Sequence, residues 1–177
     1  MNKGREANLR VKEAITNTLF ALMQKKSLSE ITITELVTGA GVARASFYRN
    51  YTSKEDVLLT LIRDILEQYR GELKQGNFFT YENVLLSFQY FKRYRTYVLD
   101  LYRSGFLAVL LEELNRFHES VAGTMPSSSI EKYQLYLYIG ALFNTALVWL
   151  PESDVTSPEA MAGFFLDTAG RMYGTTA

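Results

Sequence analysis

Residues 31–57 read ITITELVTGAGVARASFYRNYTSKEDV, and this stretch decides the fold. Thr32 stands where a helix N-cap is expected, and Glu35 follows three residues later, which is the spacing of a capping box. Apolar residues at helical spacing after Thr32 predict a short helix over about 33–39. Gly41 then supplies a residue that can adopt a positive φ in the turn that follows.

A second short helix is predicted over about 43–50, directly after that turn. Phe47 and Tyr51 are expected to point inward and to fix this helix to its domain. Two short helices joined by a three- or four-residue turn that contains Gly form a helix-turn-helix.

The outward face of the second helix suits entry into the DNA major groove. Small residues allow a close approach to the bases, and here they are Ala43, Ala45 and Ser46. Arg44 can then reach a base edge, because Arg is the commonest reader of guanine O6 and N7. The expected phosphate contacts are Tyr48, Arg49 and Lys54, with hydroxyls and backbone N–H groups from Thr32 and Thr34. A plain helical hairpin with a solvated face is the alternative, but capping, glycine spacing and charge together favour DNA binding.

Charge is distributed unevenly along the 177 residues, although the net charge is zero. Residues 1–54 contain nine Lys or Arg against four acidic residues, a net of +5, so the remainder carries −5. This asymmetry suggests a polyanion-binding N-terminal part on a neutral or acidic body, and chance clustering on a solvated face explains the charge alone equally well. The chain has no Cys, which excludes a disulfide framework and a thiolate metal site and suits a cytoplasmic location.

The rest of the chain predicts further helices and no strand, so the fold class is all-α with about nine helices. The first helix is expected over about 6–25, and a long one, capped by Ser53, over about 54–74. The later helices are expected at about 79–93, 95–103, 106–122, 128–150 and 157–173. We expect a helix-turn-helix DNA-binding domain over 1–52 and a helical regulatory and dimerisation domain over 53–177.

Residues 133–150 form eighteen residues without a charge, which is near the length of a membrane span. Gln134, Asn144 and Thr145 interrupt this apolar run, so a buried or interface helix is the better interpretation, and no membrane partner is expected.

Catalytic and metal chemistry find little support in the sequence. His118 is the only His, and one His beside the loosely spaced Glu112 and Glu119 makes a poor metal site. There is no Gly-rich phosphate loop and no nucleophile elbow. We therefore expect neither a metal nor a cofactor and no enzymatic activity.

The stretch 31–59 closely resembles the DNA-binding domain of the TetR family of transcriptional regulators. The matching features are Ala-Gly-Val at 40–42, a recognition helix of small residues, Tyr48, a second aromatic at Tyr51 and Ser-Lys-Glu at 53–55. Departures occur at Leu36-Val37, where Ile-Ala is usual, at Asn50-Tyr51, where His-Phe is usual, and at Thr52, where Pro is usual. The resemblance implies a phosphate contact at the Asn50 position.

The C-terminal part resembles a subgroup of that family common in Firmicutes, through an apolar run that ends in Trp149 and the Ser157-Pro158 start of the last helix. The resemblance implies a homodimer built by the last two helices, and therefore a palindromic operator in double-stranded DNA. The expected dimer residues are Tyr136, Ile139, Phe143, Leu147, Phe164 and Phe165.

The family places an inducer pocket among the helices at 79–122, which are rich in aromatic residues. The expected pocket residues for a small hydrophobic or aromatic ligand are Phe91, Tyr97, Tyr102 and Phe106. The leading hypothesis is therefore a dimeric repressor that a small ligand releases from its operator. The alternative is a regulator of the same family, an activator included, that a protein partner controls.

Overall fold

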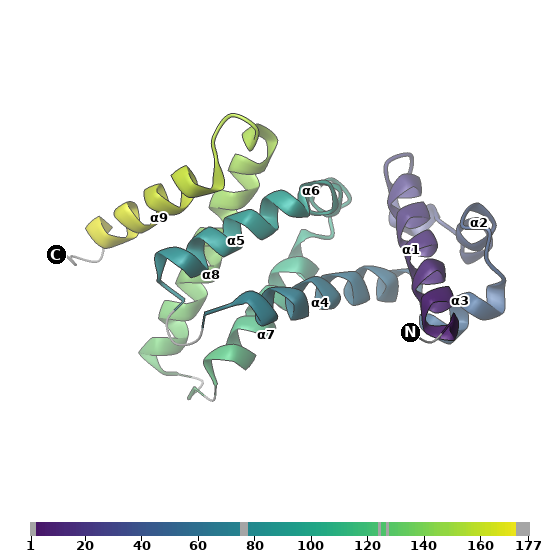
Figure 1. Cartoon of the computed structure of the whole chain (residues 1–177), viewed down its shortest axis with the longest axis horizontal. Helices are drawn as coiled ribbons and strands as arrows, with labels where there is room; N and C mark the ends of the chain where they lie inside the picture. The colour runs from purple at the N-terminus through teal and green to yellow at the C-terminus, as the bar shows by residue number, and fades with distance from the viewer. Residues whose placement is uncertain (1–2, 75–77, 124, 127, 173–177) are drawn as a thin grey trace. The chain divides into compact units, whose positions relative to one another are not determined.

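The computed structural model describes residues 3–74, 78–123, 125–126 and 128–172, and every regular element in these residues is helical (Figure 1). The elements in chain order are α1 (Lys3–Met23), η1 (Leu28–Glu30), α2 (Ile33–Gly39), α3 (Arg44–Asn50), α4 (Lys54–Glu72), α5 (Tyr81–Arg93), α6 (Arg95–Arg103), α7 (Leu107–Ala122), α8 (Ile130–Trp149), η2 (Leu150–Glu152) and α9 (Pro158–Met172). The two η elements are single 3₁₀ turns. The predicted all-α fold with nine helices is confirmed for the described residues.

Contacts divide the chain into two compact units. The first unit holds the described residues up to Ile65 together with Asp100–Leu107. The second unit holds Leu66–Leu99 and the described residues from Ala108 onward. Helices α4 and α6 therefore each contribute residues to both units. The division into domains 1–52 and 53–177 stays a prediction.

The core of the first unit forms where α1 packs on α2 and α3. Its fully shielded side chains come from several helices and are Ile15, Leu19, Leu36, Phe47, Val57 and Leu58. Burying an aliphatic or aromatic side chain of this size contributes about 1.5–3 kcal/mol. Phe47 and Tyr51 both point inward, as the sequence predicts, and their ring centroids lie 5.8 Å apart.

Local hydrogen bonds explain where the short helices begin and end. The hydroxyl of Thr32 accepts a bond from the Glu35 backbone N–H at 3.1 Å, and that of Ser53 accepts one from Asp56 N–H at 3.1 Å. Both predicted N-caps are thus confirmed. Gly41 has φ +64° in the turn between α2 and α3, a conformation that L side chains rarely adopt.

The predicted capping box at Thr32 forms only in part. The carboxylate of Glu35 pairs mainly with the ammonium of Lys26 at 2.5 Å, and the Thr32 backbone is only a weaker partner. A second difference is η1, which lies in a segment that the sequence indicated only as the end of the first helix. In this turn the carboxylate of Glu30 accepts hydrogen bonds from the Ser27 backbone N–H at 2.9 Å and from the Ser27 hydroxyl at 2.6 Å.

The second unit is built around α5, along which α9 packs. Phe88 of α5 is fully buried and meets Trp149 edge to face, with 5.4 Å between ring centroids. The side chain of Asn83 accepts a bond from the Lys74 backbone N–H at 2.9 Å and donates one to the Lys74 carbonyl at 3.0 Å. This pair of bonds joins the residues after α4 to the start of α5.

Candidate nucleic-acid interface

Helix α3 turns one face into the first unit and the other toward solvent. Its buried residue is Phe47, whereas its outward residues Arg44, Ala45, Tyr48 and Arg49 are exposed. Ala43 is the N-cap residue, so the helix begins at Arg44, one residue later than predicted. A helix that exposes small residues and arginines on one face is the form required for contact with a base edge.

Arg44 is held on that outward face by two neighbours. One guanidinium nitrogen donates to the Thr34 hydroxyl at 3.0 Å, and the other donates to the Tyr48 hydroxyl at 3.3 Å. The guanidinium carbon also lies 5.6 Å from the centroid of the Tyr48 ring, a cation–π distance. Three of the predicted DNA-binding residues, from two helices, thus form one exposed cluster.

The remaining predicted contacts on α3 bond within their own helix. Arg49 donates to the Ser46 hydroxyl at 3.3 Å, and the Asn50 amide donates to the Ser46 carbonyl at 2.8 Å. Arg49 is exposed, so its guanidinium stays accessible to a phosphate, whereas Asn50 is half-buried with its amide nitrogen directed at the backbone. Thr32 is exposed at the start of α2, where its hydroxyl serves as the N-cap.

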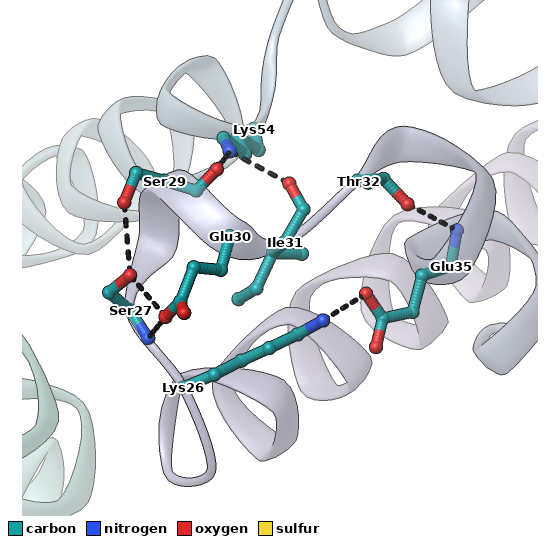
Figure 2. Close-up of polar contacts among 8 residues, drawn as sticks. All are labelled: Lys26, Ser27, Ser29, Glu30, Ile31, Thr32, Glu35 and Lys54. Carbon is teal, nitrogen blue, oxygen red and sulfur yellow. Dashed lines mark hydrogen bonds and ion pairs between the residues drawn. The ribbon is translucent and has the colours of Figure 1, made fainter.

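Lys54 has partners other than the expected phosphate. Its ammonium donates to the carbonyl of Ile31 at 2.7 Å and to that of Ser29 at 3.2 Å (Figure 2). The side chain is half-buried between the start of α4 and the turn that precedes α2. These bonds could not be predicted from local sequence patterns, because they depend on the conformation of the 3₁₀ turn.

Charged side chains brace the turn between α1 and α2 (Figure 2). The bonds from Ser27 lower the pKa of Glu30, and the bond from Lys26 lowers the pKa of Glu35. Both carboxylates are therefore ionised at neutral pH, and each stabilises the turn from one side.

Comparison with known proteins identifies this part of the chain. Residues 15–61 match the family model described as "Bacterial regulatory proteins, tetR family". The match covers the C-terminal part of α1, all of α2 and α3, and the start of α4. Residues 15–61 thus resemble the N-terminal part of tetR-family regulators.

Curated relatives match a segment of similar length. The HTH-type transcriptional regulators EthR of Mycobacterium tuberculosis and of Mycolicibacterium smegmatis are both 40% identical to this chain over 55 residues. The match covers 31% of this chain and 26% of the M. tuberculosis protein. The chain thus spans about a quarter of the length of these curated relatives.

Solved structures of bacterial regulators share the fold over most of the chain. A TetR transcriptional regulator from Streptococcus agalactiae has a TM-score of 0.64 at 20% identity, with 93% of this chain and 96% of that chain covered. The fatty acid degradation regulator FadR from Bacillus halodurans has a TM-score of 0.60 at 13% identity, covering 89% and 93%. FadR from Bacillus subtilis, solved with stearoyl-CoA, has a TM-score of 0.57 at 13% identity, covering 88% and 95%.

The residues expected to line a tetR-family inducer pocket fall in different units. Phe91 and Tyr97 belong to the second unit, where the Phe91 ring lies 6.3 Å from that of Phe143. Tyr102 and Phe106 belong to the first unit, and Tyr102 is 57% exposed. The pocket stays a prediction.

Sequence reasoning missed a buried polar atom in the second unit. His118 is buried, and its Nδ1 lies 2.8 Å from the Leu114 carbonyl. Among the described residues, its Nε2 has no hydrogen-bond partner. Rings of Phe78, Phe117 and Tyr138 surround the imidazole with centroid distances of 5.1, 5.3 and 6.3 Å. Burial lowers the pKa of His118, so the imidazole is neutral at pH 7.

The expected dimer residues do not share one surface. Ile139, Phe143 and Phe165 are buried within the protomer, and Leu147 is half-buried, whereas Tyr136 and Phe164 are exposed. The expected stripe on α8 is thus divided between core and surface, because an apolar helix offers both faces the same residue types. The exposed apolar residues of α8 that the expectation missed are Ile130, Tyr133, Leu137 and Val148.

Two kinds of site are absent from the described part of the chain. None of its helices is long and apolar enough to cross a membrane. Over the same residues, no group of three or more His, Cys, Asp or Glu side chains is placed to hold a metal ion.

Proposed function

We propose that this chain is a homodimeric transcriptional repressor that binds a palindromic operator and leaves it when a small ligand binds. The observation that carries the proposal is the cluster of Thr34, Arg44 and Tyr48, which holds a guanidinium on the exposed face of α3. The match of residues 15–61 to the tetR-family model supports the same function.

In this proposal α3 enters the major groove and Arg44 reads a base edge. The bonds from Thr34 and Tyr48 restrict the Arg44 side chain before DNA arrives, which reduces the entropy lost on binding. Exposed Ala45 lets the helix backbone approach the bases closely. Arg49 and the Thr32 end of α2 contact phosphates on either side and set the register.

A second copy of the chain is proposed to cover the exposed apolar face of α8. Tyr133 is 59% exposed, Leu137 51% and Val148 74%, and their spacing places them along one side of the helix. Gly140 lies between them, and a Cβ at this position would have no atom within 4 Å. On α9, Phe164 is 58% exposed. A twofold dimer would present two copies of α3 to successive turns of the major groove.

The ligand is proposed to act on the second unit and to be signalled through α4, which has residues in both units. A shift of α4 would change the spacing between the two copies of α3. Simultaneous contact with both half-sites would then be lost, and with it the gain in affinity from two-site binding. Since one structural relative was solved with stearoyl-CoA, long-chain acyl-CoA is the first ligand class to screen.

The experiment is capture of fragments of the source genome by the purified protein at two salt concentrations, followed by sequencing. We expect a shared palindrome that survives the higher salt, because base contacts persist where phosphate contacts weaken. Fragments with no common motif would contradict the proposal. Acyl-CoAs and other small hydrophobic molecules are then tested for release of the captured palindrome. If none releases it and a second protein co-purifies with the chain, the repressor is controlled by a partner rather than by a ligand.

A further inference from the structure

We propose that Lys54 is a positioning residue of the DNA-reading unit and that it does not contact phosphate. Its side chain ties the start of α4 to the start of α2 and so sets the position of Arg44. The inference rests on the proposed DNA-binding function and assigns a role within it. It starts from the two bonds from the ammonium to the carbonyls of Ser29 and Ile31.

The placement of Lys54 at a helix start makes these bonds informative. Lys54 is the first residue of α4, where the helix dipole disfavours a positive charge. The side chain instead reaches back across the chain to two carbonyl oxygens, which carry partial negative charge at the end of the 3₁₀ turn. Two of the three ammonium donors are occupied there, and the stem is half-buried. A side chain whose role is to meet DNA would be expected to extend into solvent.

The turn that Lys54 holds is anchored in the core of the first unit. Leu28 and Ile31 are both buried, and Ile31 directly precedes Thr32, the N-cap of α2. The ion pair between Lys26, which follows α1, and Glu35 fastens the same segment to α2. The starts of α2 and α4 are therefore both tied to the braced turn that follows α1, as the bonds in Figure 2 show.

The braced turn leads directly to the DNA-reading arginine. Two residues beyond Thr32 comes Thr34, whose hydroxyl accepts the bond from Arg44. A change in the position of the turn would move Thr34 and with it the guanidinium. Lys54 is thereby a direct link from α4, the helix proposed to carry the ligand signal, to the recognition surface.

The test compares three variants that each remove one positive charge, namely Lys54→Met, Arg49→Met and Lys25→Met. Met keeps a straight apolar stem but cannot donate a hydrogen bond. Arg49 serves as the phosphate-contact reference, and Lys25 is an exposed lysine of the same unit. For each variant we would measure the thermal midpoint of the DNA-free protein and the operator affinity as a function of salt concentration.

For Lys54→Met we expect a thermal midpoint lower by about 2–4 °C, because two hydrogen bonds from a charged donor are lost. We also expect operator binding weaker by roughly 3- to 10-fold. The slope of log affinity against log salt should match that of Lys25→Met, whereas Arg49→Met should reduce it by about one unit. Lys54→Arg, which can still donate to the carbonyls, should restore both the midpoint and the affinity.

Two results would overturn the inference. One is a salt slope for Lys54→Met that falls as far as that of Arg49→Met, which would make Lys54 a phosphate contact. The other is a midpoint equal to that of Lys25→Met, which would show that the turn needs no brace. The midpoint is measured without DNA. The midpoint therefore tests the bonds from Lys54 even if the wild-type protein selects no operator. Failure to select an operator would contradict the proposed function, not the role of Lys54 in the turn.

Discussion

The guanidinium of Arg44 and the hydroxyl of Thr34 form a 3.0 Å hydrogen bond that joins α3 to α2 across the helix-turn-helix turn. Both side chains are exposed, so the bond shapes the molecular surface rather than its core. In the proposed function this bond restricts the arginine that reads a base edge, so the geometry of α2 would affect specificity at α3.

Replacing Arg44 with Ala should relax base preference more than it weakens binding to all DNA. The variant should lose about 1–3 kcal/mol on the selected operator, because a bidentate contact with one base pair is removed. Binding to a duplex mismatched at that base pair should change much less. Fluorescence anisotropy on matched and single-mismatch duplexes measures both losses, and equal losses on the two duplexes would refute a base-reading role.

Replacing Thr34 with Val should reduce discrimination at the same base pair, but by less than Arg44→Ala does. The variant keeps the shape of the side chain and removes the hydroxyl that accepts from Arg44. The expected loss is about 0.5–1.5 kcal/mol, typical of a single hydrogen bond. Affinities for the same duplexes provide the measurement. The double variant, with both Thr34→Val and Arg44→Ala, completes a double-mutant cycle. Additive losses from the two substitutions would mean that Thr34 acts independently of Arg44.

Replacing Leu137 with Arg should convert the proposed dimer to a monomer while leaving the protomer folded. Leu137 is 51% exposed on α8, so the protomer core does not depend on it, whereas a buried charge at an interface is costly. Val155→Arg is the matched control, because Val155 is 88% exposed and lies before α9. Light scattering after size exclusion gives the mass of each. A dimeric Leu137→Arg variant would place the interface elsewhere.

Stability should fall as the pH is lowered through about 6.5 because of His118. Burial depresses the pKa of His118 in the folded state below its ordinary value of 6.5, so the unfolded chain binds the proton first. The contribution is fully present above pH 6.5. It declines below that pH by up to about 1.4 kcal/mol per pH unit, until the folded-state pKa is reached.

The single His makes this pH effect separable. Several carboxylates have a pKa lowered from 4.5 and so titrate below this window: Glu30, Glu35, Glu119 and Glu159. His118→Asn, whose amide can still donate to the Leu114 carbonyl, should flatten the dependence of the free energy of unfolding between pH 5 and 7. Urea denaturation at each pH provides the values. An unchanged slope in the variant would assign the pH effect to other groups.

Local chemistry in the sequence was sufficient to predict the helix-turn-helix. The cap at Thr32, the cap at Ser53 and the glycine at position 41 act within a few residues, so the bounds of α2 agreed with the structure and those of α3 differed by one residue. Inward placement of Phe47 and Tyr51 followed from helical spacing alone.

Other features depend on contacts that no local pattern encodes. The carbonyl partners of Lys54 exist only once the turn at η1 has folded against the start of α4. On α8, apolar residues surround nearly the whole helix, so periodicity could not separate the buried Ile139 and Phe143 from the exposed Tyr133 and Leu137. The buried Nε2 of His118 likewise follows from tertiary packing.

The central claim is that two copies of α3 read two half-sites together. The most direct test measures the affinity of the protein for a full palindrome and for the same duplex with one half-site scrambled. The account predicts that scrambling one half-site weakens binding by at least about 100-fold at moderate salt, because the gain from two-site binding is lost. It also predicts that Leu137→Arg removes most of this difference. Equal affinity of the wild-type protein for the two duplexes would contradict the account.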